Sequence, residues 1–207
     1  IGEQAFSYCK SLTQITIPSS VEVIGKSVFL QCSNLEAFFV ESDNPNYVAV
    51  DKILFTKDLK NLISYPPKKT ETTYNIPSSV TTIVDGAFSD CSLLSNISIP
   101  SSVTTIGERS FSGCSSLIKI NIPSSVTKIE VHTFSNCTSL SDITIPSSVS
   151  KIPYGAFTNC TSLQNVTIPS SVTSIDFSAF SKCPNLSSST KNVLIERYKF
   201  KLEMFSK

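Results

Sequence analysis

A fixed 23-residue spacing runs through most of this chain and limits what it can fold into. Two residue types mark the spacing over five consecutive copies: Pro77, Pro100, Pro123, Pro146 and Pro169, and Cys91, Cys114, Cys137, Cys160 and Cys183. Cys9 and Cys32 are also 23 residues apart, and Cys32 is followed by Cys91 after 59 residues, which is 23 plus 36. Periods of 20–50 residues are typical of repeats that stack along one axis. The spacing therefore predicts a solenoid with one interruption.

One complete unit, Leu117 to Ser139, shows how each repeat is expected to fold. Ile120 and Ile122 alternate with polar residues and are β-branched, which is typical of a short strand with one buried face. Pro123 ends that strand because it has no N–H to donate to a β-ladder. The unit therefore begins with a single short β-strand.

The rest of the unit carries further apolar residues. Val126 and Ile129 predict a second short extended piece, and Phe134 and Cys137 suit a helical or 3₁₀ turn on the convex side, with the ring pointing inward. One unit cannot bury its own apolar edge, so the strands are expected to stack in one parallel sheet on a concave face. These strands are predicted at residues 15–17, 38–40, 74–76, 97–99, 120–122, 143–145 and 166–168.

Two segments break the period. Residues 41–72 contain two β-prone stretches on either side of a charged turn at residues 56–60, which predicts a β-hairpin inserted in the array. Near the C-terminus, polar residues stand where the two strand isoleucines belong. We therefore expect a solenoid over residues 1–186, interrupted at about 41–72, and a C-terminal cap over residues 187–207.

The two ends of the chain differ. The segment 192–207 has apolar residues at spacings of four, four and three, which favours an amphipathic capping helix: Leu194, Tyr198, Leu202 and Phe205. The competing structure is an alternating strand, through Tyr198, Phe200, Leu202 and Met204. At the front, Ile1 has the repeat position of Ile24 and no polar cap precedes it, so we expect a piece of a longer protein.

The charge balance argues against several classes of partner. Seventeen basic and sixteen acidic residues give a net charge of +1, which leaves no strong field to attract nucleic acid or an anionic membrane. No apolar run approaches the roughly 18 residues of a membrane span. The sequence therefore predicts neither nucleic-acid binding nor membrane insertion.

The stretch I-P-S-S-V-T-x-I-G-x-x-S-F-S-G-C-S-S-L, from Ile99 to Leu117, resembles the BspA-like leucine-rich repeats, also called the TpLRR type. The segment from Asn44 to Pro67 is similar to that family's N-P-x-Y…Y-P-P insertion, with Lys52 in place of the usual glycine. The resemblance covers about residues 1–186 and implies a right-handed leucine-rich-repeat solenoid. It also implies a surface protein of mucosal bacteria or parasitic protists that adheres to host matrix or cells, without a catalytic motif.

The seven cysteines share one repeat position, and no two are closer than 23 residues. This spacing contains neither a C-x-x-C motif nor a zinc knuckle. A buried ladder of thiols is the favoured interpretation. Adjacent rungs place Cα atoms about 5 Å apart, within disulfide reach, so disulfides stay an alternative and a metal site is a third.

The other candidates for chemistry are isolated. His132 occupies a variable repeat position, and we expect it at the solvated surface rather than as a general base. Asp43, Asn44 and Asn46 do not have the spacing of an EF-hand loop and instead predict an Asx turn before Pro45. Because no nucleophile elbow or phosphate loop is present, we expect no enzyme activity, cofactor or metal.

Sequons of the form N-x-S/T mark candidate glycosylation sites if the protein is secreted by a eukaryote. They lie at Asn96, Asn136, Asn159, Asn165 and Asn185. Asn136 and Asn159 directly precede a ladder cysteine, so Asn165 is the better candidate of these three.

The concave strand face is the candidate binding surface. Its outward residues are predicted to be Gln14, Thr16, Ala37, Phe39, Asn96, Ser98, Lys119, Asn121, Asp142, Thr144, Asn165 and Thr167. Nine of them form the candidate protein-binding set: Phe39, Asn96, Ser98, Lys119, Asn121, Asp142, Thr144, Asn165 and Thr167. Phe39 lies close in sequence to the hairpin aromatics Tyr47, Phe55 and Tyr65, which form either part of this surface or the hairpin's own core.

Two functions fit this surface. The first is a cell-surface adhesin or antigen that binds host or matrix proteins with modest affinity per repeat, reinforced by multivalency. The second is an intracellular scaffold or regulatory platform, for which reduced cysteines are the supporting feature. The family resemblance favours the first.

Overall fold

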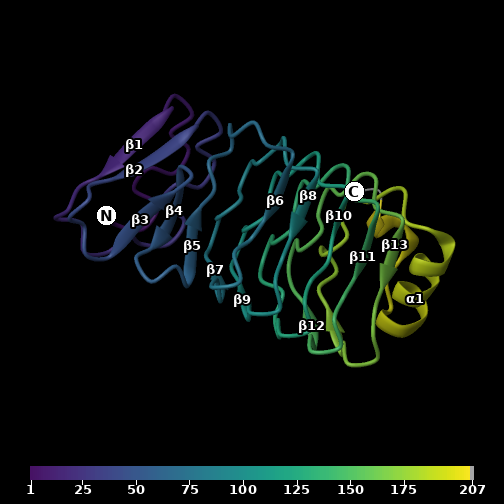
Figure 1. Cartoon of the computed structure of the whole chain (residues 1–207). Helices are drawn as coiled ribbons and strands as arrows, with labels where there is room; N and C mark the ends of the chain where they lie inside the picture. The colour runs from purple at the N-terminus through teal and green to yellow at the C-terminus, as the bar shows by residue number, and fades with distance from the viewer. Residues whose placement is uncertain (206–207) are drawn as a thin grey trace.

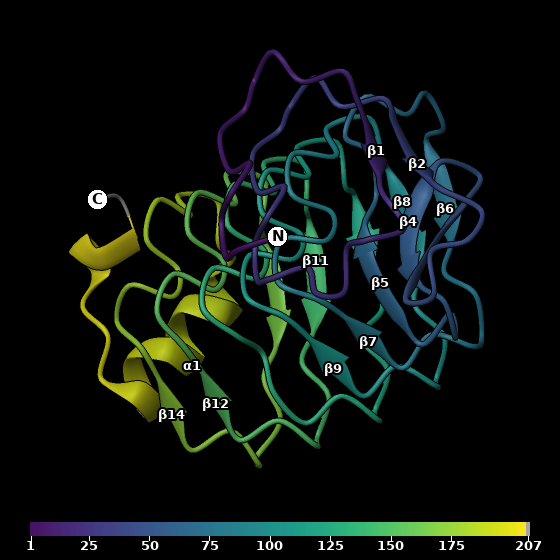
Figure 2. The same cartoon turned by 90° about the vertical axis from the view of Figure 1, so that its left-hand side faces the viewer.

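The structure is a computed structural model that describes residues 1–205, without the side chains of Leu202 and Met204. The chain winds into a β-solenoid whose successive turns lie side by side, from the N-terminal turns at one end to a helix at the other (Figure 1). Viewed from the N-terminal end, the turns lie one behind another (Figure 2). The solenoid predicted from the 23-residue spacing is therefore confirmed.

A parallel main sheet carries one strand from each repeat, in the predicted register. Its strands are β1 (Gln14–Ile17), β2 (Ala37–Val40), β6 (Thr73–Asn75), β8 (Asn96–Ser98), β10 (Lys119–Ile120), β11 (Asp142–Thr144) and β13 (Asn165–Thr167). Ile97 pairs with Ile120, and Ile143 pairs with Val166, each across a 23-residue shift. The sheet is split into β1–β2 and a five-stranded part from β6 to β13, because the insertion separates β2 from β6.

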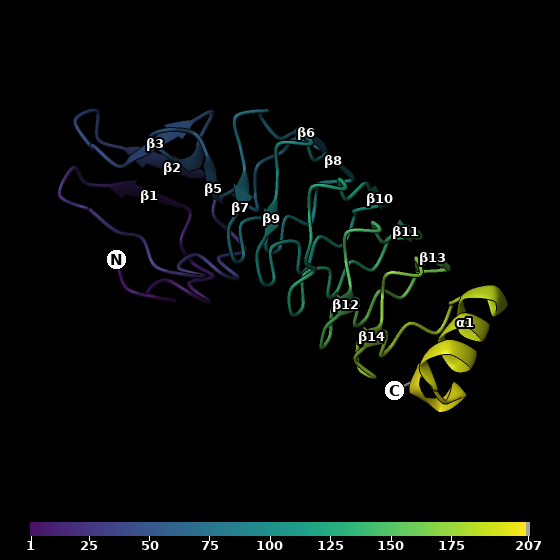
Figure 3. The same ribbon diagram turned by 90° about the horizontal axis from the view of Figure 1, so that it is seen from below.

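A second row of short strands lies across the solenoid from the main sheet (Figure 3). It consists of β7 (Thr82–Ile83), β9 (Thr105–Ile106), β12 (Lys151–Ile152) and β14 (Ser174–Ile175). Their isoleucines are buried, as predicted for a second extended piece in each repeat. In the repeat that contains Val126 and Ile129 these two residues are buried but form no strand. The segment around Phe134 and Cys137 forms hydrogen-bonded turns rather than the predicted helical or 3₁₀ turn, because each turn also bonds to the next rung, as Phe134 N does to Ala156 O.

The interior is organised as stacks of identical side chains. Five phenylalanine rings form one stack, with adjacent centroids 5.2–5.5 Å apart and each ring 0% exposed: Phe88, Phe111, Phe134, Phe157 and Phe180. Cysteines form a parallel ladder beside them, and all but Cys9 are buried. Stacking in register lets each repeat bury apolar surface that it could not bury alone.

Ser110, which directly precedes Phe111 of the stack, has a buried hydroxyl group without a hydrogen-bond partner, and this gives a stability prediction. Ser110 is 0% exposed and its Oγ has no hydrogen-bond partner, whereas alanine fills the same repeat position at 87, 156 and 179. A buried hydroxyl without a partner retains its desolvation penalty. We expect Ser110→Ala to raise the free energy of unfolding by about 1 kcal/mol in urea denaturation.

Ser112 is the matched control for this prediction. Its Oγ lies 2.8 Å from the Oγ of Ser135, so Ser112→Ala should lower the free energy of unfolding and leave Ser135 with one partner fewer. Equal effects of the two substitutions would show that the hydrogen-bond status of the hydroxyl does not decide its contribution.

The insertion contains three antiparallel strands: β3 (Tyr47–Val50), β4 (Ile53–Thr56) and β5 (Asn61–Ser64). The hairpin predicted around the charged turn at residues 56–60 is confirmed as β4–β5, but a second hairpin, β3–β4, was not predicted. β5 pairs in parallel with β7, and Tyr65 stacks on Phe88 with centroids 5.4 Å apart. The insertion therefore replaces one rung of the solenoid.

The unpredicted β3–β4 turn places Asp51 and Lys52 at φ 50° and 66°. Two-residue hairpin turns with positive φ at both positions favour Asp-Gly or Asn-Gly, because a side chain is strained there. We expect Lys52→Gly to raise the free energy of unfolding by about 1 kcal/mol. Lys57→Gly is the control, because residue 57 does not have positive φ. If urea denaturation shows the same increase in the free energy of unfolding for both variants, strain at Lys52 is not the cause.

The C-terminal cap is helical, so the alternating strand is wrong. The helix α1 (Ser188–Tyr198) begins before the predicted segment 192–207, because Ser187 caps it by accepting a hydrogen bond from Thr190 N. It ends where Lys199 takes φ 64°, and the short 3₁₀ helix η1 (Leu202–Phe205) follows. Among the predicted helix-face residues Leu194 is buried; the Leu202 and Met204 side chains and residues 206–207 lie outside the described part.

The C-terminal cap forms hydrogen bonds with backbone groups at the open edge of the last repeat. Thr190 Oγ1 accepts from Val166 N at 3.2 Å and donates to Gln164 O at 3.1 Å, as a neighbouring strand would. The Arg197 guanidinium donates to three carbonyl oxygens of the last turn, those of Pro169, Ser170 and Val172. Backbone groups that would otherwise recruit another strand are therefore occupied.

Candidate functional site

The outward side chains of β6 to β13 form a continuous polar surface, here called the sheet face. It consists of Thr73, Asn75, Asn96, Ser98, Lys119, Asn121, Asp142, Thr144, Asn165 and Thr167, all exposed. The isoleucines between them are buried, because successive side chains of a strand point to opposite sides. The sheet face brings together eight of the nine predicted binding residues.

Thr73 and Asn75 belong to the sheet face but were missing from the predicted set. They pair in register with Asn96 and Ser98. The signal was present in the sequence, because Tyr74 has the repeat position of Ile97 and its two neighbours must therefore point outward. The surface extends one repeat further toward the insertion than predicted.

Phe39 lies apart from the sheet face, on β2 in the separate two-stranded sheet, where it is 44% exposed. Ala37 was predicted to point outward, but it is 5% exposed. The prediction for Ala37 is wrong because the insertion folds against β2, where Phe38 N donates to Lys52 O at 3.0 Å.

The hairpin aromatics do not extend this surface. Tyr47, Phe55 and Tyr65 are 7%, 2% and 1% exposed, so they form part of the interior. They are therefore not part of the binding surface, but they form no separate hairpin core either: Phe55 and Tyr65 belong to the large interior cluster, and Tyr47 belongs to the N-terminal one. Phe39 is left as an isolated exposed ring.

Hydrogen bonds from neighbouring polar side chains hold the Asp142 carboxylate on the sheet face. Asp142 accepts hydrogen bonds from Ser141 Oγ at 2.6 Å and from Asn165 Nδ2 at 2.7 Å. These bonds, together with attraction to Lys119, lower the pKa of the Asp142 carboxyl. The centre of the sheet face therefore presents a fixed negative charge next to a positive one at neutral pH.

A shallow depression of about 630 Å³ lies on the sheet face where β6, β8 and β10 meet. Asn75, Asn96 and Asn121 supply amide groups at its rim, and Ile118, which is 56% exposed, supplies apolar surface. Amides both donate and accept hydrogen bonds, and Lys119 adds an ammonium group to the same lining. Four of the nine predicted binding residues line this depression: Asn96, Ser98, Lys119 and Asn121.

The cysteine ladder is a structural feature of the interior. Each buried thiol lies against a carbonyl oxygen of the preceding rung, as Cys114 Sγ does at 3.1 Å from Phe88 O. Burial raises the pKa of Cys32 to about 11 and that of Cys183 to about 12. These groups stay protonated at neutral pH, and a protonated, buried thiol is a poor nucleophile and a poor metal ligand. The buried ladder predicted from the repeat is confirmed, and all seven cysteines are free.

His132 is partly buried rather than fully solvated as predicted. Its ring packs edge-on against Tyr154 with centroids 5.0 Å apart and lies over Gly155, which leaves room for it. Burial and the neighbouring Arg109 lower its pKa. Within residues 1–205, no group of three or more His, Cys, Asp or Glu side chains is arranged to hold a metal ion.

Asn44 forms the predicted Asx turn. Its Oδ1 accepts from the backbone N–H groups of Asn46 and Tyr47 at 2.9 and 2.8 Å, and its Nδ2 donates to Pro18 O. Because Asn44 is 1% exposed, it fixes the start of the insertion against the second turn of the solenoid.

The sequon asparagines differ in their surroundings. Asn136 and Asn159 take φ values of 60° and 61°, a left-handed conformation that asparagine tolerates, and Asn159 Nδ2 donates to Asn136 Oδ1. The amide groups of Asn165 and Asn185 also donate, to Asp142 and to Thr161 O. Asn96 is exposed on the sheet face. Glycosylation at these positions stays a prediction.

Within residues 1–205, no helix combines the length and the apolar character needed to cross a bilayer.

Stacked 23-residue turns with one strand each, a phenylalanine stack and a cysteine ladder define a leucine-rich-repeat protein. The chain belongs to the BspA type leucine-rich repeat family, whose sequence model matches residues 1–65 and 68–187 in six copies. No curated protein matches the chain significantly.

Three solved structures illustrate the likeness. A leucine-rich cell surface protein from Faecalibacterium prausnitzii is 36% identical, with a TM-score of 0.80 over 87% of this chain and 50% of its own. A leucine-rich repeat protein from Eubacterium ventriosum is 35% identical, with a TM-score of 0.75 over 86% of this chain and 54% of its own. The TpLRR protein of T. pallidum is 25% identical, with a TM-score of 0.58 over 98% of this chain and 78% of its own. This chain thus spans about half the length of the first two relatives.

Proposed function

We propose that this chain is a non-enzymatic protein-binding module of a cell-surface adhesin or antigen, and that it engages host or matrix proteins through the sheet face. The observation that carries the proposal is the row of exposed polar residues held by buried, in-register isoleucines, in a chain 36% identical to a bacterial cell surface protein. Repeat proteins commonly recognise partners through such extended surfaces.

The composition of the sheet face supports modest affinity per repeat. It offers amides, hydroxyls and the Lys119 and Asp142 charges, but lacks the Trp, Tyr and Arg side chains that dominate most binding hot spots. Several repeats that contact one extended partner, or several copies on one surface, would raise the effective affinity without stronger single contacts.

A direct binding assay tests the proposal. The labelled chain is applied to immobilised fibronectin, laminin and collagen and to intact epithelial cells, with a heat-unfolded sample as control. We expect saturable attachment of the folded chain to at least one of these surfaces. Attachment no greater than that of the unfolded sample on every surface would contradict the adhesin role.

The second candidate function is an intracellular scaffold built on the same solenoid. Seven free cysteines, six of them buried, favour it, because thiols persist most readily in a reducing compartment. An antibody against this region separates the two functions: an adhesin labels intact source cells, whereas a scaffold labels them only after permeabilisation.

A further inference from the structure

The insertion divides the hydrophobic interior into two clusters. One contains Ile17, Phe29 and Leu54 from the first turns and the insertion, and the other runs from Ile53 to Phe205. Ile24 and Ile63 pack against the first cluster and Val84 against the second, and all three are only partly buried. The boundary between the two clusters therefore leaves aliphatic surface open to solvent.

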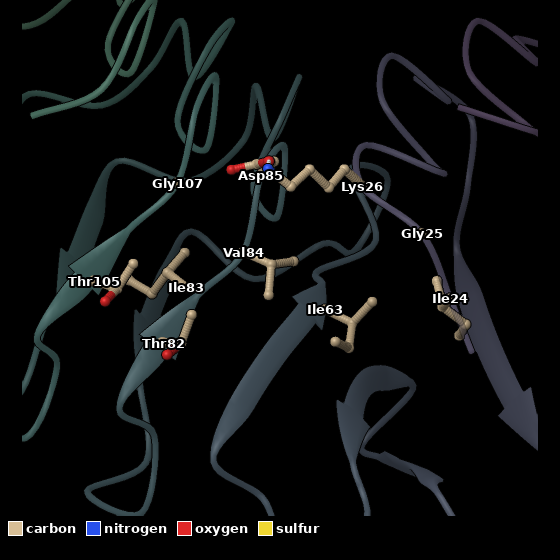
Figure 4. Close-up of a pocket in the computed structure, with 10 residues that line it drawn as sticks. All are labelled: Ile24, Gly25, Lys26, Ile63, Thr82, Ile83, Val84, Asp85, Thr105 and Gly107. Carbon is tan, nitrogen blue, oxygen red and sulfur yellow. Dashed lines mark ion pairs between the residues drawn. The ribbon is translucent and has the colours of Figure 1, made fainter. Parts of the chain in front are cut away.

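A pocket of about 390 Å³ lies at this boundary (Figure 4). Ile24, Ile63, Ile83 and Val84 supply most of its apolar lining, and Thr105 stands on its exposed side. The volume is at the lower end of the roughly 300–1,000 Å³ typical of ligand pockets. Its size and lining suit a branched aliphatic side chain together with part of the backbone that carries it.

Four charged residues share a single repeat position, and two of them, Lys26 and Asp85, line the pocket; the other two are Glu3 and Glu108. The Lys26 side chain extends toward Asp85, and its Nζ lies 3.9 Å from Asp85 Oδ2 (Figure 4). The pocket lining therefore carries one carboxylate and one ammonium group, which face each other. Whether Asp85 can accept a charge from a partner depends on how firmly Lys26 is held.

The two members of the Lys26–Asp85 pair differ in how firmly they are held. The Asp85 side chain is 22% exposed, and its Oδ1 accepts a hydrogen bond from Glu108 N at 2.9 Å. The Lys26 side chain is 76% exposed, and exposed ion pairs contribute only about 0–1 kcal/mol. Another cation can therefore replace the Lys26 ammonium at Asp85 while the carboxylate stays in place.

We propose that this pocket binds an extended segment of a partner protein, which inserts a branched aliphatic side chain among Ile24, Ile63 and Val84 and places an adjacent basic side chain at Asp85. The aliphatic group removes apolar surface from water on both sides of the boundary. The inference rests on the proposed protein-binding function and adds a recognition site outside the sheet face.

Capped dipeptides test the chemistry of the pocket on the intact chain. Acetyl-Leu-Lys-amide is titrated while the backbone amide signals are followed by NMR. We expect chemical-shift changes concentrated at Val84, Asp85 and Gly107. Acetyl-Ala-Lys-amide should bind about tenfold more weakly, because most of the aliphatic burial is lost, and acetyl-Leu-Glu-amide should also bind more weakly. Equal binding of all three dipeptides, or shifts confined to the sheet face, would overturn the proposal.

Variants test the site itself. Thr105→Trp places a large ring at the exposed side of the pocket, and Thr104→Trp, at an exposed residue that does not line it, is the matched control. Only Thr105→Trp should abolish the shifts, while both variants keep the circular dichroism spectrum of the parent. Asp85→Asn retains an acceptor for Glu108 N and should weaken acetyl-Leu-Lys-amide binding by up to about fivefold.

The dipeptide results test the pocket, and the attachment results test the adhesin function, so each proposal can fail without the other. Dipeptide binding that survives Thr105→Trp would reject the pocket, even if the chain still attaches to matrix proteins. Attachment that is absent on every matrix and cell surface would reject the adhesin role, whatever the dipeptides show.

Discussion

Ile120→Asp is expected to lower the free energy of unfolding by about 4 kcal/mol or more, a loss seen only for buried charges and comparable core damage. Ile120 is 4% exposed and pairs in register with Ile97 inside the main sheet. A carboxyl group there has no partner and no water, so its pKa must rise above the value of about 3.9 that it has in the unfolded chain.

The loss of stability in Ile120→Asp should therefore depend on pH. A carboxyl whose pKa is raised by folding is least destabilising below its unfolded pKa, near pH 4, and becomes more destabilising as pH rises through the folded value. Thermal unfolding at pH 4 and pH 7 measures the change. Asn121→Asp is the control, because residue 121 is exposed and its substitution should stay within about 0.5 kcal/mol. Similar losses for both variants would show that the two positions do not alternate between core and solvent.

Phe134→Ala is expected to lower the free energy of unfolding by about 3–5 kcal/mol, because it removes one ring from the middle of the phenylalanine stack. Phe134 is 0% exposed, and its ring centroid lies 5.4 Å from that of Phe111 and 5.5 Å from that of Phe157. The cavity is flanked by rigid rungs whose backbones are hydrogen-bonded to one another, so it cannot close easily.

Urea denaturation followed by circular dichroism measures this loss. Phe39→Ala is the matched control, because Phe39 is 44% exposed and contributes little to the interior. A loss of less than about 1 kcal/mol for Phe134→Ala, or an equal loss for Phe39→Ala, would mean that the stack does not hold the repeats together.

The sequence predicted the register of the main sheet because every rung repeats the same constraint. Ile97, Ile120 and Ile143 stand at one repeat position, and a slip by one residue would expose all of them together. The same alternation predicts that Lys119 and Asp142 point outward, as they do in the structure. A repeated pattern thus predicts both the core and the surface opposite it.

The features that the sequence did not predict arise where the repetition stops. Lys52 gives no turn signal, so the β3–β4 hairpin was missed, although its turn adopts the left-handed conformations that glycine favours. Ala37 has an outward repeat position but is covered by the insertion, a contact between distant segments that no local pattern encodes. The pocket beside Ile24 and Val84 has the same origin, since it exists only because the insertion separates two turns.

Attachment by a sheet-face variant shows whether partner proteins bind to the sheet face. Lys119, Asn121, Asp142 and Thr144 are replaced together by alanine, and the control replaces four exposed residues of the same two repeats away from that face: Ser124, Thr127, Ser147 and Ser150. Both variants should stay folded, because exposed substitutions usually change stability by less than about 0.5 kcal/mol each. We expect that only the sheet-face variant loses attachment to the matrix protein or cell surface that the intact chain binds. Full attachment by the sheet-face variant, or an equal loss in both variants, would contradict it.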